Sequence, residues 1–363
     1  MEMESLLGTE LKQLSGPVMV TGHTGFKGTW LTLLLEKLGV PVVGYSLQQS
    51  DDSLFAKLGR LGKIPESFQD VRDSSSLARF MEVHKPSVVL HMAAQSLVLN
   101  SYQCPRETFE VNSQGTVNVL DSAFKQYGIK VIGVVTTDKV YKNDNSGHKF
   151  IESDPLSGKD PYSASKVAAE AAVAAWQQVS KVSGGPKVIA LRAGNVIGGG
   201  DWAKNRLIPD LALSYLSKKE VVVRSPNSRR PWQHVLDPLC GYLMALENCL
   251  KNSTEDAYNF GPKEESLSVL SLIETLEKIW NSDFIYKLLP ETLEIEKEAK
   301  TLQLNSSLAT IKLGWEPVFS QIEAIERTGA WWEQIKQGNQ TFHQAMSLDI
   351  DFFLNQIQKR GKI

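Results

Sequence analysis

Residues 17–28 of the chain read PVMVTGHTGFKG. The apolar run Val18 to Val20 predicts a buried strand, and residues 25–37 predict an amphipathic helix directly after it. A helix N-terminus presents unpaired N–H groups and partial positive charge, and glycines let a diphosphate approach the backbone there. Gly22, Gly25 and Gly28 therefore predict a dinucleotide-binding turn, with a ligand-free strand–helix turn as the alternative. Their Gly-x-x-Gly-x-x-Gly spacing differs from the commoner Gly-x-Gly-x-x-Gly fingerprint.

Short apolar runs and amphipathic stretches keep alternating through the first half of the chain. Strands are expected at 40–45, 88–91, 130–135 and 188–191, and helices at 74–83, 107–126 and 162–179. In the helix at 25–37, the residues expected to face inward are Trp30, Leu31, Leu34 and Leu35. Short apolar strands separated by helices predict a parallel sheet that is covered on both faces. The expected fold class is therefore α/β, a doubly wound parallel sheet of the Rossmann type.

The later half of the chain has a less regular pattern, with helices expected at 206–217, 236–249 and 269–280. We expect residues 16–198 to form the dinucleotide-binding domain. Residues 199–337 are expected to form mainly a smaller substrate-binding lobe interleaved with the sheet, and residues 338–363 a C-terminal extension. The extension contains an apolar cluster that packs either on the body or on a partner, and the sequence leaves both open: Ile350, Phe352, Phe353 and Leu354.

Composition excludes several classes of protein. The 363 residues, 42% hydrophobic and 22% charged, suit one large two-part globular unit. A net charge of -2 does not indicate a basic surface that binds nucleic acid. No run approaches the roughly 20 apolar residues that span a bilayer. Residues 1–15 lack the basic start and apolar core of a signal peptide. The three cysteines, Cys104, Cys240 and Cys249, are too scattered for a disulfide framework or a zinc site. We expect a cytoplasmic protein without nucleic-acid, membrane or metal partners.

The end of the second expected strand bears on which dinucleotide binds. An acid there usually binds the adenosine ribose, but residues 44–52 contain no acid before Asp51. No arginine is placed there for a 2′-phosphate either, so NAD is favoured over NADP. Asp70 and Val71, after a further expected strand, are candidates for holding the adenine amine. A solvated loop acid is the alternative for Asp70.

Tyr162 and Lys166 stand four residues apart and therefore share one helix face. A phenol with an ordinary pKa near ~10 is a poor base at neutral pH. An adjacent ammonium, together with a positive nicotinamide, lowers the pKa of such a phenol. The pair predicts hydride-transfer chemistry, with Tyr162 as the base and Lys166 also holding the nicotinamide ribose. Ordinary helix surface is the alternative, because Tyr-x-x-x-Lys is common by chance.

The segment Thr136 to Lys139 follows the strand expected at 130–135. Ligands bind at the carboxyl ends of the strands in open α/β sheets, so these side chains are expected at the site. Thr137 is a candidate to hydrogen-bond a substrate hydroxyl, Asp138 to donate a proton and Lys139 to accept one. A solvated turn pair is the alternative for Asp138 and Lys139.

At these residues the chain resembles the nucleotide-sugar 4,6-dehydratases of the extended short-chain dehydrogenase/reductase family, over residues 18–315. The segments that carry the resemblance are HMAAQ at 91–95, NSQGT at 112–116, TDK at 137–139, YSASK at 162–166, LRAGNV at 191–196 and LGWEP at 313–317. Three further segments are similar to the branch that acts on CDP-glucose: HTGFKG at 23–28, GNVIGGGDWA at 194–203 and RPWQHV at 230–235. Lys139 fits that branch, because relatives acting on dTDP- and GDP-sugars usually have glutamate there.

The resemblance implies a redox-neutral lyase with NAD as cofactor. CDP-glucose would lose water to give CDP-4-keto-6-deoxyglucose, in deoxysugar biosynthesis such as that of lipopolysaccharide O-antigen. Tyr162 would take the C4 hydroxyl proton, Asp138 would protonate the departing C6 hydroxyl, and Lys139 would act at C5. Asp138 serving both of the last two roles is an alternative. The resemblance also implies a homodimer or homotetramer.

Three other functions stay open from the sequence. They are a nucleotide-sugar 4-epimerase, a dehydratase acting on another nucleotide-hexose, and a non-catalytic NAD sensor. Asp138 and Lys139 favour dehydration over epimerisation, because an epimerase needs no acid to expel the C6 hydroxyl. An intact Tyr162 and Lys166 argue against a sensor.

The same reasoning yields a set of expected binding residues. Those expected to bind the cofactor are Gly22, Thr24, Gly25, Phe26, Lys27, Gly28, Asp70, Val71, Ala93, Ala94, Gln95, Asn112, Thr136, Tyr162 and Lys166. Those expected to bind the substrate are Asn195, Arg206, Arg230, His234 and Asn259. Arginine suits a diphosphate because its planar fork forms paired charge-assisted hydrogen bonds. A surface ion pair is the alternative for Arg230, and His91 is expected in the core.

Overall fold

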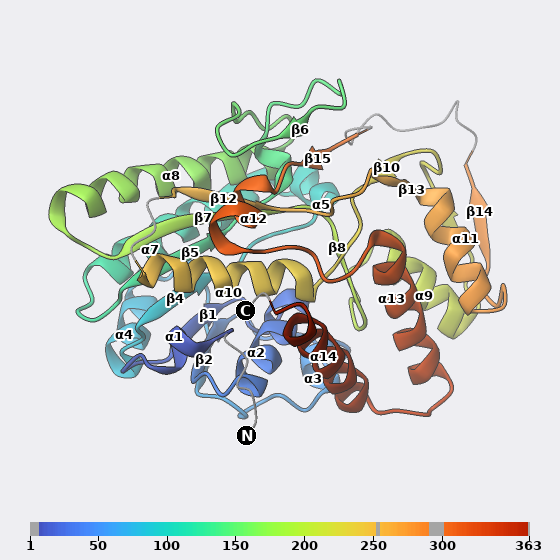
Figure 1. Cartoon of the computed structure of the whole chain (residues 1–363), viewed down its shortest axis with the longest axis horizontal. Coiled ribbons are helices and arrows are strands. Elements are labelled where there is room, and N and C mark those ends of the chain that lie inside the picture. Colours follow the sequence, from blue (N-terminus) through green and yellow to red (C-terminus); the bar gives the residue numbers. More distant parts are fainter. Residues whose placement is uncertain (1–6, 252–254, 290–300, 362–363) are drawn as a thin grey trace.

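The protein is described here by a computed structural model that covers residues 7–251, 255–289 and 301–361. Its centre is a seven-stranded sheet with the order β12-β7-β5-β4-β1-β2-β3 (Figure 1). Every neighbouring pair in this sheet is parallel, which confirms the doubly wound parallel fold. The strands are β1 (Val18–Thr21), β2 (Val42–Ser46), β3 (Glu66–Phe68), β4 (Val88–His91), β5 (Val131–Val135), β7 (Lys187–Ala193) and β12 (Ala257–Phe260).

Helices cover both faces of the sheet, because successive residues of a strand point to opposite sides. Val18 and Val20 pack into one core with Trp30 and Leu34, whereas Met19 between them packs into a second core. The first core is covered by α2 (Phe26–Lys37) and α10 (Leu236–Leu250). The second is covered by α4 (Ser74–His84), α7 (Gly115–Phe124) and α8 (Pro161–Ser183). Each face of the sheet therefore has its own apolar layer.

The turn between β1 and α2 depends on two glycines. Gly22 has a φ of +75°, a left-handed conformation that favours glycine. A Cβ on Gly28 would lie 2.1 Å from the main-chain oxygen of Gly22. The helix can therefore start close against the turn only because Gly28 has no side chain.

Segments from the later half of the chain form a smaller lobe, on the right in Figure 1. It contains α9 (Leu207–Ser217), α11 (Val269–Ile279) and α13 (Gln321–Lys336), with β9 (Val221–Val223) paired to β14 (Tyr286–Leu288). The later half is not confined to this lobe, because α10 covers the sheet and β12 extends its edge beside β7. The remaining short elements are α1 (Thr9–Lys12), α3 (Leu54–Lys57), α5 (Val98–Gln103), α6 (Pro105–Phe109), β6 (Lys149–Phe150), β8 (Val196–Ile197), β10 (Arg229–Arg230), β11 (Gln233–His234), β13 (Leu267–Ser268), β15 (Gln303–Leu304) and α12 (Ser307–Leu313).

Several elements differ from the sequence expectation, and the helices α13 and α14 (Phe342–Lys359) were not among those expected. The long helix expected at 107–126 begins at Pro105 and contains a π-helical turn at Glu110–Gln114 before α7. Proline suits the first helical position because its missing N–H needs no partner there. Strand β12 was not expected, because Asn259 interrupts its apolar pattern. In the structure Asn259 is buried, donates to the Phe150 oxygen across 2.9 Å and accepts from the Tyr141 hydroxyl across 2.7 Å.

The C-terminal helix α14 (Phe342–Lys359) packs on the body of the protein. Ile350 and Phe353 are buried in the first core, and Leu354 packs against it. Phe352 is 40% exposed, and the Arg327 guanidinium lies 3.4 Å from its ring centroid. Of the two alternatives that the sequence left open, the structure thus shows packing on the body.

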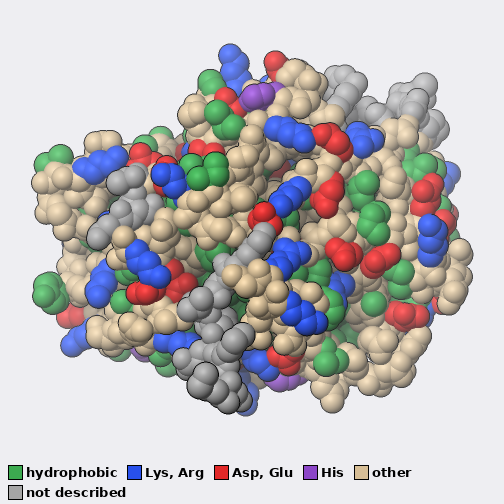
Figure 2. Space-filling view, in the orientation of Figure 1, with side chains coloured by type: hydrophobic (Ala, Val, Ile, Leu, Met, Phe, Trp, Pro, Cys, Tyr) green, Lys and Arg blue, Asp and Glu red, His purple; other side chains and the backbone are tan. Residues whose placement is uncertain are grey.

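The molecular surface carries both signs of charge. Figure 2 shows basic and acidic side chains interspersed over the visible face rather than gathered into patches of one sign. This distribution agrees with the formal net charge of -2. Among the described residues, no helix combines the length and apolar character needed to cross a membrane.

Candidate active site

A cavity of about 1190 Å³ lies where the strands of the sheet end and the lobe begins. The loops after β1, β2, β4, β5 and β7 line one side, and residues 204–210, 221–225 and 230–232 line the other. Ligands of open α/β sheets bind at this edge. A volume above roughly 1,000 Å³ exceeds the usual range for one small ligand. The cavity therefore has room for a cofactor and a second molecule.

The N-terminus of α2 opens into this cavity. Five predicted cofactor residues line it: Gly22, Gly25, Phe26, Lys27 and Gly28. Gly25 is the N-cap residue, and no side chain caps the first turn. A Cβ on Gly25 would meet nothing closer than the Gly22 oxygen, 3.4 Å away, so the backbone is open to a ligand. Unpaired N–H groups at such a helix start fit a diphosphate.

Thr24, also predicted to bind the cofactor, has a supporting position instead. Its hydroxyl lies 2.7 Å from the Ser46 hydroxyl and donates to the Leu47 oxygen across 2.9 Å. The side chain thereby ties the turn after β1 to the end of β2. Thr24 is buried and is absent from the cavity lining, whereas Ser46 and Leu47 line it.

Asp70 and Val71 line the cavity beyond β3, as the cofactor prediction requires. Arg72 donates from Nη2 to the Asp70 carboxylate across 2.7 Å, and its main-chain N–H donates across 2.8 Å. The hydrogen bond from the Arg72 side chain is the main cause that lowers the pKa of Asp70 below its ordinary value. An ionised carboxylate at this position can accept a hydrogen bond from an amine. Its contact with adenine stays a prediction.

The loop after β4 places Ala93 and Ala94 in the cavity lining, but Gln95 and Asn112 stand behind that wall. Asn112 accepts from the Gln95 main-chain N–H across 2.8 Å and donates to the Gln95 oxygen across 2.9 Å. It also donates to the Ser165 hydroxyl across 2.9 Å, which links the loop to α8. Asn112 and Gln95 thus shape the wall and do not face the cavity.

Tyr162 and Lys166 lie in the first turns of α8 and face the cavity. Asp160 and Ser163 form a capping box, and Pro161 occupies the first helical position, which fixes where the helix begins. Lys166 Nζ donates to the Val135 oxygen across 3.1 Å. Burial lowers the pKa of Lys166 to about 8.

The electrostatics of Tyr162 differ from the sequence expectation. Burial raises the pKa of Tyr162 to about 12, while a hydrogen bond with Thr137 and the charge of Arg206 act in the opposite direction. We expected a lowered pKa because Lys166 lies one turn away. Among the protein's own groups, burial outweighs the groups that favour the phenolate.

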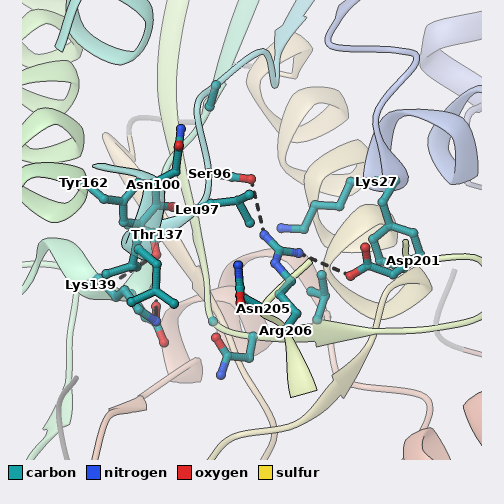
Figure 3. Close-up of a pocket in the computed structure, with 18 of the residues that line it drawn as sticks. Lys27, Ser96, Leu97, Asn100, Thr137, Lys139, Tyr162, Asp201, Asn205 and Arg206 are labelled. Carbon is teal, nitrogen blue, oxygen red and sulfur yellow. Dashed lines mark hydrogen bonds and ion pairs between the residues drawn. The ribbon is translucent and has the colours of Figure 1, made fainter. Parts of the chain in front are cut away.

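The segment after β5 brings the other catalytic candidates into the same cavity. Asp138 is 2% exposed, and its Oδ1 atom accepts from the Thr137 hydroxyl across 3.0 Å. Lys139 Nζ lies 3.9 Å from the same oxygen. A Cβ on Gly194 would lie 2.8 Å from Asp138 Oδ2, so glycine leaves space for this carboxylate. Because Asp138 is buried, the pair is not the solvated turn that was the alternative. Figure 3 shows Thr137 and Lys139 close to Tyr162 at the cavity.

A buried ionic network behind this segment was not predicted. Glu170 of α8 receives two hydrogen bonds of 2.8 Å from Arg192 of β7. Thr136, expected to bind the cofactor, lines the cavity but donates its hydroxyl to Glu170 across 2.5 Å. Arg192 also donates to the Tyr141 hydroxyl across 2.8 Å. Arg192 belongs to the segment LRAGNV at 191–196, which carries part of the resemblance noted from the sequence, but no sequence rule identified Glu170 as its partner.

Three of the five predicted substrate residues line the cavity, namely Asn195, Arg206 and Arg230. His234 does not. It is fully buried between the rings of Trp30 and Phe319, and burial lowers its pKa to about 3. Asn259 does not either, because it is held in β12 by Tyr141 and Phe150. Their apolar strand surroundings place both residues in the interior and correct the prediction.

His91 lies in the core, as expected. It is 2% exposed, and its ring nitrogens lie 2.7 Å from the Thr21 hydroxyl and 3.1 Å from the Thr116 hydroxyl. Two residues that the sequence did not single out belong to the cavity instead. Ser96 and Asp201 line it and hold the Arg206 guanidinium, each across 3.3 Å.

Comparison with known proteins identifies the family. Residues 18–261 match the model of the NAD dependent epimerase/dehydratase family. The CDP-glucose 4,6-dehydratase of Salmonella typhimurium is 38% identical over 323 residues, covering 86% of this chain and 89% of that protein. A UDP-glucose 4-epimerase of Halalkalibacterium halodurans is 26% identical over 341 residues, covering 89% of this chain and 98% of that protein.

Solved structures share the fold. A UDP-glucose 4-epimerase from Stenotrophomonas maltophila, solved with bound NAD, has a TM-score of 0.77 at 22% identity and covers 89% of this chain and 99% of its own. A dTDP-glucose 4,6-dehydratase from Bacillus anthracis, in complex with NAD, has a TM-score of 0.74 at 20% identity, with coverage of 89% and 98%. At these identities the likeness is one of fold.

The family match covers the whole sheet with its glycine turn and catalytic candidates, and the match to the 38% identical relative covers 86% of the chain. The prediction of NAD as the cofactor is confirmed by the family, and the cavity residues fit it. The chain belongs to the NAD dependent epimerase/dehydratase family and is an NAD-dependent enzyme of its nucleotide-sugar dehydratase and epimerase group.

Proposed function

We propose that the protein is a nucleotide-sugar 4,6-dehydratase, a hydro-lyase that converts CDP-glucose to CDP-4-keto-6-deoxyglucose. The observation that carries the proposal is the buried Asp138 carboxylate beside Lys139, in the same cavity as Tyr162 and Lys166. A reaction that expels a hydroxyl needs a group that can protonate it, and we assign that role to Asp138. The 38% identity to a CDP-glucose 4,6-dehydratase supports the choice of substrate.

The protein groups would act in a fixed order. Tyr162 takes the C4 hydroxyl proton, helped by the Thr137 hydrogen bond and the Arg206 charge, both of which lower its pKa. The resulting 4-ketone acidifies the C5 hydrogen, and Lys139 accepts that proton. Asp138 protonates the C6 oxygen as the C–O bond breaks, so one water leaves. Lys139 returns its proton to C5 when a hydride reaches C6, and the proton gained by Tyr162 passes to solvent while Asp138 regains one. When bound, NAD would supply the hydride acceptor for C4 and the donor for C6, and the positive charge of its oxidised form would favour the Tyr162 phenolate.

A nucleotide-sugar 4-epimerase is the second candidate. It is favoured by the epimerases among the relatives, at 26% identity, and it would use the same Tyr162 and Lys166. It has no step that needs Asp138 to expel a hydroxyl. Chemistry at C6 therefore separates the two functions.

The test is to incubate the purified protein, with NAD added, with CDP-, dTDP-, UDP- and GDP-hexoses. Mass spectrometry of the products is the readout. The proposal predicts loss of one water from CDP-glucose and a ketone that absorbs in strong alkali. An isomer of unchanged mass identifies an epimerase, and water loss from another nucleotide-hexose corrects the substrate alone.

A further inference from the structure

Lys27 belongs to the glycine turn, but its side chain runs away from that turn and into the cavity (Figure 3). Its Nζ atom donates to the Tyr242 hydroxyl of α10 across 3.3 Å and lies 5.6 Å from the centroid of that ring. Within the described part of the chain, no carboxylate forms an ion pair with Lys27. Its hydrogen-bond partner is thus a neutral phenol, and the Asp138 carboxylate acts on it through its charge without forming an ion pair.

Arg206 approaches Lys27 from the opposite wall. It is the N-cap residue of α9 in the lobe, and its guanidinium is held by Asp201 and Ser96. In Figure 3 the Lys27 and Arg206 side chains point toward one another. Burial, followed by the charges of Arg206 and Lys166, lowers the pKa of Lys27 to about 7, while the charge of Asp138 acts in the opposite direction. Two cations that converge in this way repel each other unless an anion enters between them.

Two diphosphates enter a cavity of this kind, one in the cofactor and one in the nucleotide sugar. The open N–H groups at the start of α2 already suit the cofactor diphosphate. The Lys27 ammonium does not lie at this helix start. It faces Arg206 of the lobe, and the lobe forms the other wall of the cavity. An anion held between Lys27 and Arg206 therefore lies on the substrate side.

We propose that Lys27 and Arg206 clamp the diphosphate of the nucleotide-sugar substrate, so that a residue of the cofactor turn binds the substrate. This inference rests on the proposed nucleotide-sugar function but not on the identity of the base. A hydrogen bond from a cation to a phosphate is stronger than a hydrogen bond between two neutral groups. Binding of the nucleotide sugar thus depends on a residue of the same turn that holds NAD.

The first test measures binding by calorimetry. The NAD-saturated wild type is titrated with CDP, UDP, dTDP and GDP, and the tightest-binding diphosphate is then used with each variant. Lys27→Met should weaken the binding of this diphosphate by about 10- to 100-fold, because that is the affinity lost when a hydrogen bond to a charged group is removed. Lys27→Arg should recover most of the affinity, and Lys125→Met, which removes a lysine outside the cavity lining, should leave it unchanged. Thermal unfolding of each variant checks the fold.

The second test measures the number of protons taken up when the diphosphate binds. A lysine with a purely structural role would not change this number. With a pKa near 7, Lys27 is largely neutral at about pH 8, and a bound diphosphate favours its charged form. The wild type should then take up about one proton more per bound diphosphate than Lys27→Met, measured by calorimetry in buffers of different ionisation enthalpy. Equal proton uptake contradicts the clamp.

The outcomes separate the two proposals. If Lys27→Met weakens NAD binding and leaves diphosphate binding unchanged, Lys27 belongs to the cofactor and the inference is wrong. If both variant and wild type bind the diphosphate equally, the inference fails while the proposed function stands. If the wild type binds none of the four diphosphates, both are overturned.

Discussion

Lys166 Nζ donates a hydrogen bond to the main-chain oxygen of Val135 across 3.1 Å. Val135 is the last residue of β5, so the bond fixes α8 against the sheet immediately before the catalytic segment. Tyr162 lies one helical turn before Lys166 and faces the same cavity. The position of the phenol relative to Asp138 is therefore set by one helix and one strand end that touch each other.

Tyr162→Phe should lower turnover by ~10²-fold or more, because it removes the titrating hydroxyl and keeps the ring. NAD affinity should stay close to that of the wild type, because Lys166 and the glycine turn are unchanged. Fluorescence titration with NAD and rapid-quench assays of C4 oxidation measure the two effects. Substantial residual turnover would assign the first proton transfer to another group, such as Thr137.

Asp138→Asn and Lys139→Met should separate the two halves of the elimination. Asp138→Asn keeps the shape and removes the acidic proton, so C4 oxidation should survive while water loss slows by ~10²-fold. Lys139→Met should instead slow the uptake of solvent deuterium at C5, read by mass spectrometry. If Lys139→Met exchanges and eliminates at the wild-type rate, Lys139 is structural and Asp138 serves as both acid and base.

Glu170→Gln should destabilise the protein by about 3–5 kcal/mol, because it leaves the buried Arg192 charge without its carboxylate. Asp121→Asn, which removes the exposed i,i+4 partner of Lys125, is the matched control and should cost at most about 0.5 kcal/mol. Urea unfolding of both variants gives the comparison. Equal losses for the two would mean that the buried network contributes little.

Because His234 is buried, the free energy of unfolding should depend on pH. Its pKa in the folded protein is about 3, below the ordinary 6.5, so the unfolded chain binds more protons between these values. The stability from a neutral His234 is complete above pH 6.5 and is lost as the pH falls toward 3. His91 behaves in the same way. His234→Phe should flatten the fall in unfolding free energy between about pH 6 and about pH 4 by up to ~1.4 kcal/mol per pH unit.

The same variant tests where His234 acts. His234 is outside the cavity lining, so nucleotide-sugar affinity at neutral pH should match the wild type. A tenfold or larger loss of affinity, with normal folding, would restore the substrate-binding role expected from the sequence.

Much of the sheet was predictable from local pattern. Val18 to Val20 and residues 88–91 are short apolar strands, and Trp30, Leu31, Leu34 and Leu35 are all buried as expected. Strand β12 was not predictable, because the polar Asn259 is satisfied only by partners 109 and 118 positions away. Such long-range hydrogen bonds leave no local trace in a sequence.

The site was predictable where a motif stands on a strand end or helix start. Tyr162, Lys166 and the segment 137–139 all reach the cavity for that reason. Thr24, Gln95 and Asn112 belong to other motifs of the same resemblance but turn away, because their side chains complete hydrogen bonds within the wall. Whether a motif residue faces a ligand or supports its neighbours depends on packing partners that the motif does not contain.

In the proposed reaction one sugar is oxidised at C4 and reduced at C6 within a single turnover. The direct measurement uses CDP-glucose deuterated at C4, with mass spectrometry and NMR locating the label in the product. We expect deuterium at C6 of a 4-keto-6-deoxy sugar and no accumulation of NADH. Label returned to C4 of an isomeric hexose, or recovered in NADH in stoichiometric amounts, would contradict it.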